Sequence, residues 1–154
     1  MAHSTATRRN TRQHRHPHPL RLPQDRAPRA VLDLGALATA PRWARAWTRQ
    51  VLREWRLSVL SDRAELIVSE LTTNAMLASG PDHPRMRLTL ALDHGELAIS
   101  VQDHCPSAPE PGNAADDDEH GRGLLLVEAM SSRSGWYSSE DGTPGKVVWA
   151  ALSS

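Results

Sequence analysis

The sequence predicts one α+β domain built as a two-layer sandwich, with helices on one face of a mixed, mostly antiparallel sheet. Three observations lead to this fold class. Two helical segments follow each other, two alternating segments form a hairpin, and a third helical segment precedes a second pair of strands. Helices and antiparallel strands are therefore segregated along the chain instead of alternating in parallel βαβ units. A length of 154 residues leaves room for one such domain and a tail.

The first predicted elements are a short strand and a helix. Residues 30–35 are mostly apolar and end in Gly35, which indicates an edge strand. Pro41 suits the first turn of a helix, which is expected to run to about residue 57. Apolar side chains recur every four residues in this helix and predict a stripe that packs in the core rather than docking a partner. The stripe consists of Trp43, Trp47, Val51, Leu52 and Trp55.

A second helix follows the first. Asp62 and Glu65 have the spacing of a capping pair, so we expect them to open this helix. The helix is predicted to run to about Ser79 and to stop at Gly80-Pro81.

The remaining segments predict two hairpins and a third helix. Residues 85–92 and 96–103 both alternate, and Asp93-His94-Gly95 between them predicts a tight turn. Residues 104–120 form a long polar loop, a type of segment that is often functional. A helix over 124–130 and strands over 135–137 and 146–152 complete the domain.

Charge is distributed unevenly along the chain, although 18 basic residues balance 18 acidic ones. Residues 1–29 hold seven Arg, one Asp and four of the eight His, with almost no apolar side chains. Such a segment cannot bury enough surface to offset its ordering entropy, so it is predicted to be a disordered basic tail. The domain is then residues 30–154. A basic arm can contact nucleic acid or an acidic protein face, but a solvated tail without a partner is favoured, and no sequence-specific nucleic-acid binding is expected.

The rest of the composition favours a cytoplasmic protein. No apolar run follows the Arg cluster as it would in a secretory signal, and no segment has the about 20 apolar residues of a membrane span. The single cysteine, Cys105, excludes an intramolecular disulfide and disfavours a Cys-based zinc site.

One candidate site lies on the second helix. Glu70 and Asn74 are four residues apart, which makes their side chains neighbours on a helix that is otherwise largely apolar. A carboxylate can orient or deprotonate an attacking hydroxyl, and an amide oxygen can join phosphate oxygens around Mg²⁺. Taken alone, the pair is weak evidence, since both side chains facing solvent would explain it as well.

Two further segments carry candidate residues. Gly121-Arg122-Gly123 before Leu124 resembles a glycine turn at a helix start, where backbone amides and an arginine can bind phosphate. Asp103 ends a strand, where its carboxylate can accept a hydrogen bond from an adenine amino group. The simpler alternatives are a tight turn for the glycines and a turn-initiating role for Asp103.

Together, the order and spacing of these segments resemble a known family. ELIVSELTTNAMLASG, the VQDHCPSAP stretch, GRGLLLVEAM and GKVVWAAL are similar to segments of the small ATP-binding regulatory proteins of actinobacteria. These are stand-alone histidine-kinase-like (Bergerat, or GHKL) ATPase domains related to anti-sigma-factor serine/threonine kinases. The resemblance covers about residues 30–152 and implies the Bergerat form of the two-layer sandwich, with ATP and Mg²⁺ as cofactors.

The resemblance assigns roles to individual residues. Glu70 matches the catalytic base, Asn74 the Mg²⁺-binding position and Asp103 the adenine-reading aspartate. Gly121 and Gly123 match the phosphate-loop glycines, and residues 104–120 match the ATP lid. Arg122 and Leu124 complete the predicted nucleotide-binding set.

Three departures from the family pattern stand out. Cys105 replaces the glycine expected after Asp103, and Ala78 replaces a histidine often found four residues after the asparagine. The acidic run 116–119 precedes the glycines and would repel a triphosphate unless it points outward or helps to hold metal. An exposed solubilising run is the favoured interpretation.

The resemblance implies an ATP·Mg²⁺-binding regulator that phosphorylates a serine or threonine of a small antagonist protein, binds a sigma factor, or does both. The alternative is a non-catalytic binding module, with or without nucleotide. A sensor histidine kinase is disfavoured because the chain has no room for a separate phosphoacceptor helix pair or sensor. A homodimer is left open.

Overall fold

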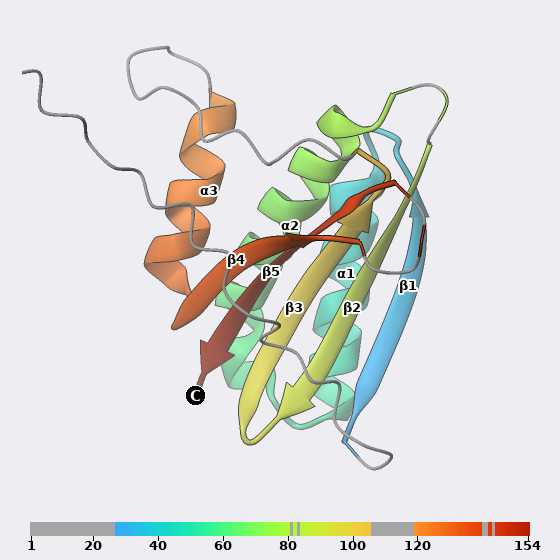
Figure 1. Cartoon of the computed structure of the whole chain (residues 1–154). Coiled ribbons are helices and arrows are strands. Elements are labelled where there is room, and N and C mark those ends of the chain that lie inside the picture. The colour runs from blue at the N-terminus through green and yellow to red at the C-terminus, as the bar shows by residue number, and fades with distance from the viewer. Residues whose placement is uncertain (1–26, 81, 83, 106–118, 140–141, 143) are drawn as a thin grey trace, which may run out of the picture.

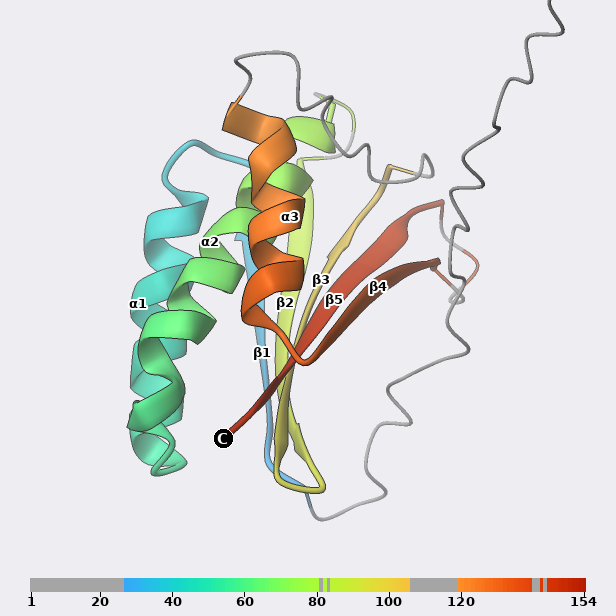
Figure 2. The same ribbon diagram turned by 90° about the vertical axis from the view of Figure 1, so that its left-hand side faces the viewer.

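The computed structural model describes residues 27–80, 82, 84–105, 119–139, 142 and 144–154, and for residues 119–122 it describes the backbone alone. Three helices cover one face of a five-stranded sheet of order β1-β2-β3-β5-β4 (Figures 1 and 2). The strands are β1 (Arg29–Gly35), β2 (Arg85–Asp93), β3 (Glu96–Asp103), β4 (Arg133–Ser138) and β5 (Lys146–Ser153). The helices are α1 (Ala40–Glu54), α2 (Ser61–Ala78) and α3 (Glu119–Met130), with a short 3₁₀ turn at Ser58–Leu60.

This architecture confirms the predicted α+β two-layer sandwich. All four pairings between the described strands are antiparallel, so the sheet has no mixed character in this part of the chain. The edge strand β1 begins at Arg29, and the N–H of Leu92 bonds to the Pro28 carbonyl. The predicted boundary at residue 30 therefore falls one residue inside β1.

The hairpin between β2 and β3 is confirmed. Asp93 pairs with Glu96, and the two residues between them have positive φ angles, 48° at His94 and 79° at Gly95. Positive φ at both central positions is the geometry of a tight hairpin turn whose twist matches that of the strands.

The core lies between the sheet and the helices. Leu97, Ile99 and Val101 alternate along β3 toward the helices, and each is at most 1% exposed. They contact a continuous cluster to which every helix contributes, including Leu52 of α1, Leu71 of α2 and Val127 of α3. Burial of these apolar side chains is the main stabilising term of the fold.

The stripe predicted on α1 is partly wrong. Trp47 and Trp55 pack against the core and Val51 is buried, but the Trp43 side chain is 65% exposed. The centre of the buried face is formed by Leu52 of the predicted stripe together with three smaller side chains outside it. These are Ala40, Ala44 and Thr48. A helix buries an arc wider than one row, and periodicity alone did not identify the row at its centre.

Helix α1 also ends earlier than predicted, at Glu54. Arg56 takes a left-handed conformation with φ 58°, and the N–H groups of Arg56 and Leu57 bond to the carbonyls of Arg53 and Leu52. This is the Schellman arrangement, which satisfies the last carbonyls of a helix and redirects the chain.

The predicted capping pair of α2 is wrong. The helix follows the 3₁₀ turn directly, its N-cap is Leu60, and no side chain caps it. Glu65 instead forms an ion pair with Arg49 of α1, with 2.6 Å between Arg49 Nε and Glu65 Oε1. This ion pair joins α1 to α2. Leu60 at the N-cap is a buried apolar residue, so it cannot act as a polar cap.

The predicted loop 104–120 lies mostly outside the described residues, as do the acids at 116–118 and the tail up to residue 26. The described helices include none that is long and apolar enough to cross a membrane.

Candidate functional site

The first group of candidate residues lies where α2 faces the first half of α3. Glu70 and Asn74 are one turn apart on α2, and both are half-buried. Leu71 and Ala75 beside them are buried, which fixes the face that the polar pair presents. The alternative that both residues simply face solvent is therefore wrong for this structure.

Gly123 lies very close to the polar pair on α2. A Cβ at this position would collide with Glu70 Oε2 and would lie 3.3 Å from Glu70 Cδ and 3.9 Å from Asn74 Oδ1. The missing side chain lets the backbone of α3 approach the carboxylate and the amide together. The structure thus brings three predicted site residues, Glu70, Asn74 and Gly123, into one place.

The predicted glycine turn is wrong in form, because Gly121, Arg122 and Gly123 all lie inside α3. Glycine costs up to about 1 kcal/mol relative to alanine in a helix interior, which is why the sequence favoured a turn. At Gly123 the close approach to Glu70 supplies a reason for the residue. Leu124, predicted to contact nucleotide, is half-buried and packs against the core cluster.

Asp103 anchors a second group at the end of β3. Its side chain is 1% exposed, and both carboxylate oxygens have partners. The Cys105 N–H donates to Oδ1 at 2.8 Å, and the Lys146 ammonium lies 2.8 Å from Oδ2. The bond to Cys105 is the turn-initiating role that the sequence left open for Asp103. It now coexists with a buried ion pair.

Sequence reasoning missed Lys146. It is the only lysine of the chain and the first residue of β5, directly opposite Asp103 in the antiparallel register. Its side chain is 5% exposed, and a long cation is almost never buried unless it is paired. Gly145 before it is also constrained, since a Cβ there would collide with the Asp103 carbonyl oxygen. A lone lysine after a glycine at a strand start was the available signal.

The two groups lie at the same end of the sandwich. The C-terminal half of α2, the beginning of α3, the end of β3 and the beginning of β5 all meet this end (Figure 1). Glu70 and Asp103 supply negative charge to the site, and among the side chains described there Lys146 supplies positive charge. Only the Asp103 charge is neutralised by a described contact.

The site offers few protein ligands to a metal. No group of three or more His, Cys, Asp or Glu side chains suited to a metal exists among the described residues. A Mg²⁺ ion held mainly by phosphates and water needs only one or two protein oxygens. Asn74 can supply one, so the residues present fit a nucleotide-borne Mg²⁺ rather than an all-protein metal site.

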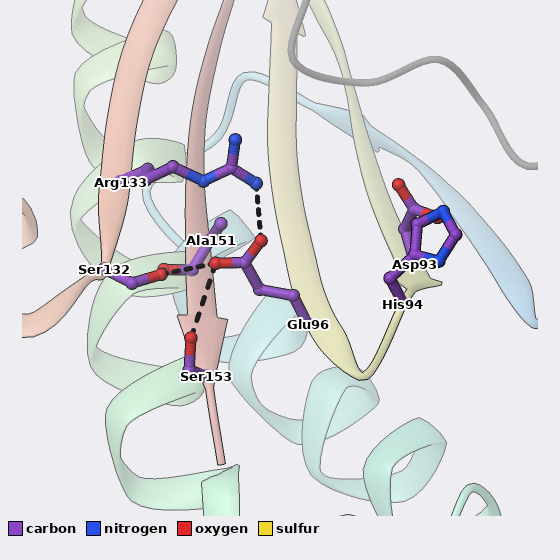
Figure 3. Close-up of polar contacts among 7 residues, drawn as sticks. All are labelled: Asp93, His94, Glu96, Ser132, Arg133, Ala151 and Ser153. Atoms are coloured by element: carbon purple, nitrogen blue, oxygen red, sulfur yellow. Dashed lines mark hydrogen bonds and ion pairs between the residues drawn. The ribbon is translucent and has the colours of Figure 1, made fainter.

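A second polar cluster lies at the opposite end of the sheet and is structural (Figure 3). Glu96 of β3 accepts hydrogen bonds from Arg133, Ser132 and Ser153. The hydrogen bonds from Arg133 and Ser132 hold the pKa of Glu96 below its usual range. These contacts join β3 to the chain around β4 and β5, and each charge in them has a described partner.

Comparison with known proteins adds a family. The model of the histidine kinase-like ATPase domain matches residues 32–152. Among solved structures, the crystal structure of the RsbU and RsbW domains of Rv1364c from Mycobacterium tuberculosis is similar, with a TM-score of 0.59 and 22% sequence identity. The similarity covers 82% of this chain and 32% of that chain, and at this identity it shows the fold alone. No curated protein matches the chain.

Proposed function

The chain belongs to the histidine kinase-like ATPase domain family, and we propose that it is a regulatory protein that binds ATP with Mg²⁺ at the end of the sandwich where α2, α3 and β3 meet. The observation that carries this proposal is the approach of Gly123 to Glu70 and Asn74. Because Gly123 has no side chain, the backbone of α3 lies close to the Glu70 carboxylate and the Asn74 amide, which supports a shared site for phosphates and their metal ion.

Each residue then has a separate task in binding. Asn74 offers its amide oxygen to Mg²⁺, and the amino-terminal part of α3, with Gly121, Arg122 and Gly123, favours the phosphates through its backbone dipole. Asp103 accepts a hydrogen bond from the amino group of adenine. Leu124 helps to fix α3 against the core, which holds the phosphate-binding backbone in place.

We further propose protein kinase activity. Glu70 takes the proton of a serine or threonine hydroxyl while that oxygen accepts the γ-phosphoryl group and ADP leaves. Its position beside Asn74 and Gly123 supports this role, because a base must lie within reach of both the hydroxyl and the phosphate. The proposed substrate is a small antagonist protein and the proposed second partner is a sigma factor, both in the cytoplasm.

Glu70→Gln tests the catalytic role. The variant keeps the size of the side chain and removes the base, so we expect near-normal ATP affinity and phosphotransfer reduced about 100- to 10,000-fold. Glu128→Gln on the exposed face of α3 is the matched control and should transfer phosphate normally. Asn74→Ala should weaken Mg²⁺-dependent binding and rate together. Unchanged transfer by Glu70→Gln would show that Glu70 is not the base.

A specific observation also favours the alternative, a non-catalytic binding module. Both oxygens of Asp103 already have partners within the protein, and Cys105 stands where the family has glycine. ATP binding by the wild type without transfer to any antagonist protein would make this alternative the better description.

A further inference from the structure

The ion pair between Asp103 and Lys146 places a hydrogen-bond acceptor and a donor side by side. The Lys146 Nζ and Asp103 Oδ2 atoms are 2.8 Å apart, on adjacent strands and on the helix-facing side of the sheet. The strand register holds them in this relation, because Asp103 and Lys146 are direct partners across the ladder. Gly145 brings the two strands into close contact at the same point.

Neither group is saturated by its described contacts. A carboxylate has about four acceptor positions and an ammonium group has three donor hydrogens. The contacts to Cys105 and Lys146 use two of the acceptor positions of Asp103, and the ion pair uses one hydrogen of Lys146. Acceptor and donor capacity therefore remains on two adjacent atoms.

We infer that Lys146 is a base-reading residue: its ammonium group donates a hydrogen bond to ring nitrogen N1 of adenine, while Asp103 accepts one from the 6-amino group. This inference rests on the proposed function, since it places the base at Asp103. The adenine edge carries a donor and an acceptor on neighbouring atoms, which is the complement of the carboxylate–ammonium pair. Guanine has a carbonyl oxygen in place of the amino group and an N–H at N1, so it would oppose acceptor to acceptor and donor to donor in this orientation.

Burial of the pair strengthens this discrimination. The two side chains are 1% and 5% exposed, so a base reaches them only when neighbouring groups of the chain move aside. Contacts made in such an enclosed place are not shared with water, so the opposed acceptors and donors of a mismatched base would find no water to bond to instead.

The test compares adenine nucleotides on the wild-type protein by calorimetry. Replacing N1 of ATP by CH (1-deaza-ATP) removes the proposed contact and should weaken binding about 10- to 100-fold, the range of a hydrogen bond to a charged group. Replacing N7 by CH (7-deaza-ATP) alters the other edge of the base and should change the affinity little. Equal affinities for ATP and 1-deaza-ATP would overturn the inference, as would an equal loss with both analogues.

A variant completes the cycle. Lys146→Met, with its folding checked by circular dichroism, should bind ATP and 1-deaza-ATP equally. If this variant bound ATP more tightly than the wild type does, the inference would be overturned, because Lys146 would then compete with the base for Asp103. Since the wild-type comparison uses no substitution, it decides the question even if the variant does not fold. A folded wild type that binds no ATP would overturn the proposed function, and the inference with it.

Discussion

Removing either partner of the buried pair of Asp103 and Lys146 should lower the unfolding free energy of this domain strongly. At 2.8 Å and an effective dielectric constant of about 20, two unit charges attract each other by about 6 kcal/mol. Removing water from each ion opposes this attraction by several kcal/mol, so the pair contributes little net stability. Removing one partner leaves the other charge buried and uncompensated, which costs about 3–5 kcal/mol.

A double-mutant cycle measures this coupling. Asp103→Asn removes the charge but keeps an oxygen for the Cys105 N–H, and Lys146→Met keeps most of the aliphatic stem. Each single variant should lose about 3–5 kcal/mol of unfolding free energy, and the double variant should be more stable than either, so the coupling energy should exceed the larger of the two single losses. Urea unfolding followed by tryptophan fluorescence suits the measurement, because Trp149 of β5 is 2% exposed.

The chain provides a matched control. Asp33 and Arg87 form an ion pair of 2.7 Å across β1 and β2, but their side chains are 65% and 54% exposed. Asp33→Asn and Arg87→Met should therefore couple by less than about 1 kcal/mol, and high salt should weaken that coupling further. A coupling energy for Asp103 and Lys146 as small as that of the control would refute the reasoning.

Three other outcomes are expected. Gly123→Ala should leave stability near that of the wild type, because the gain of up to about 1 kcal/mol in helix propensity offsets the cost of displacing the Glu70 carboxylate. The variant should nevertheless impair ATP binding and phosphotransfer. Gly80→Ala, where a Cβ meets open space, is the control, and equal transfer by both variants would contradict a role of Gly123 in the site. Because the folded-state pKa of Glu96 is lowered, its contribution of about 0.5–1 kcal/mol is fully present above the ordinary pKa of a glutamate and is lost as the pH falls through the folded value. Glu96→Gln should therefore be less stable than the wild type at pH 7, and this difference should shrink as the pH is lowered in urea titrations; a constant difference would exclude this linkage. A chain beginning at Ala27 keeps the bond from the Leu92 N–H to the Pro28 carbonyl and should retain the Tm of the full chain, whereas a clear drop would show that the preceding residues stabilise the domain.

Local patterns were sufficient to predict most of the secondary structure. The hairpin of β2 and β3 followed from alternation and from a turn sequence that permits positive φ at His94 and Gly95. Periodicity identified α1 as amphipathic but placed Trp43 in the core, because it gives the direction of a face and not which row lies at its centre. The end of α1 was missed because an arginine rarely adopts the left-handed conformation that Arg56 takes.

The part of the site that depends on local spacing could be predicted, whereas the part that depends on packing and strand register could not. Glu70 and Asn74 could be paired because their spacing on one helix is local. The position of Gly123 beside them depends on how α3 packs on α2, and its low helix propensity favoured a turn. Lys146 could not be paired with Asp103 from the sequence, since the register of β3 against β5 joins segments that are far apart in the chain.

Stability and base recognition converge on the same pair, and this affects how any variant there must be judged. Nucleotide that binds only the folded protein raises its stability by RT ln(1 + [L]/Kd). A variant that unfolds more readily therefore loses apparent affinity even if its site is intact, and Lys146→Met is expected to lose both stability and a contact with the base. The ratio of the affinities for ATP and 1-deaza-ATP cancels the folded fraction, because both ligands require the same folded state. That ratio should fall from about 10–100 in the wild type to about 1 in the variant if Lys146 contacts N1. A ratio that stays constant while both affinities fall would assign Lys146 to stability alone.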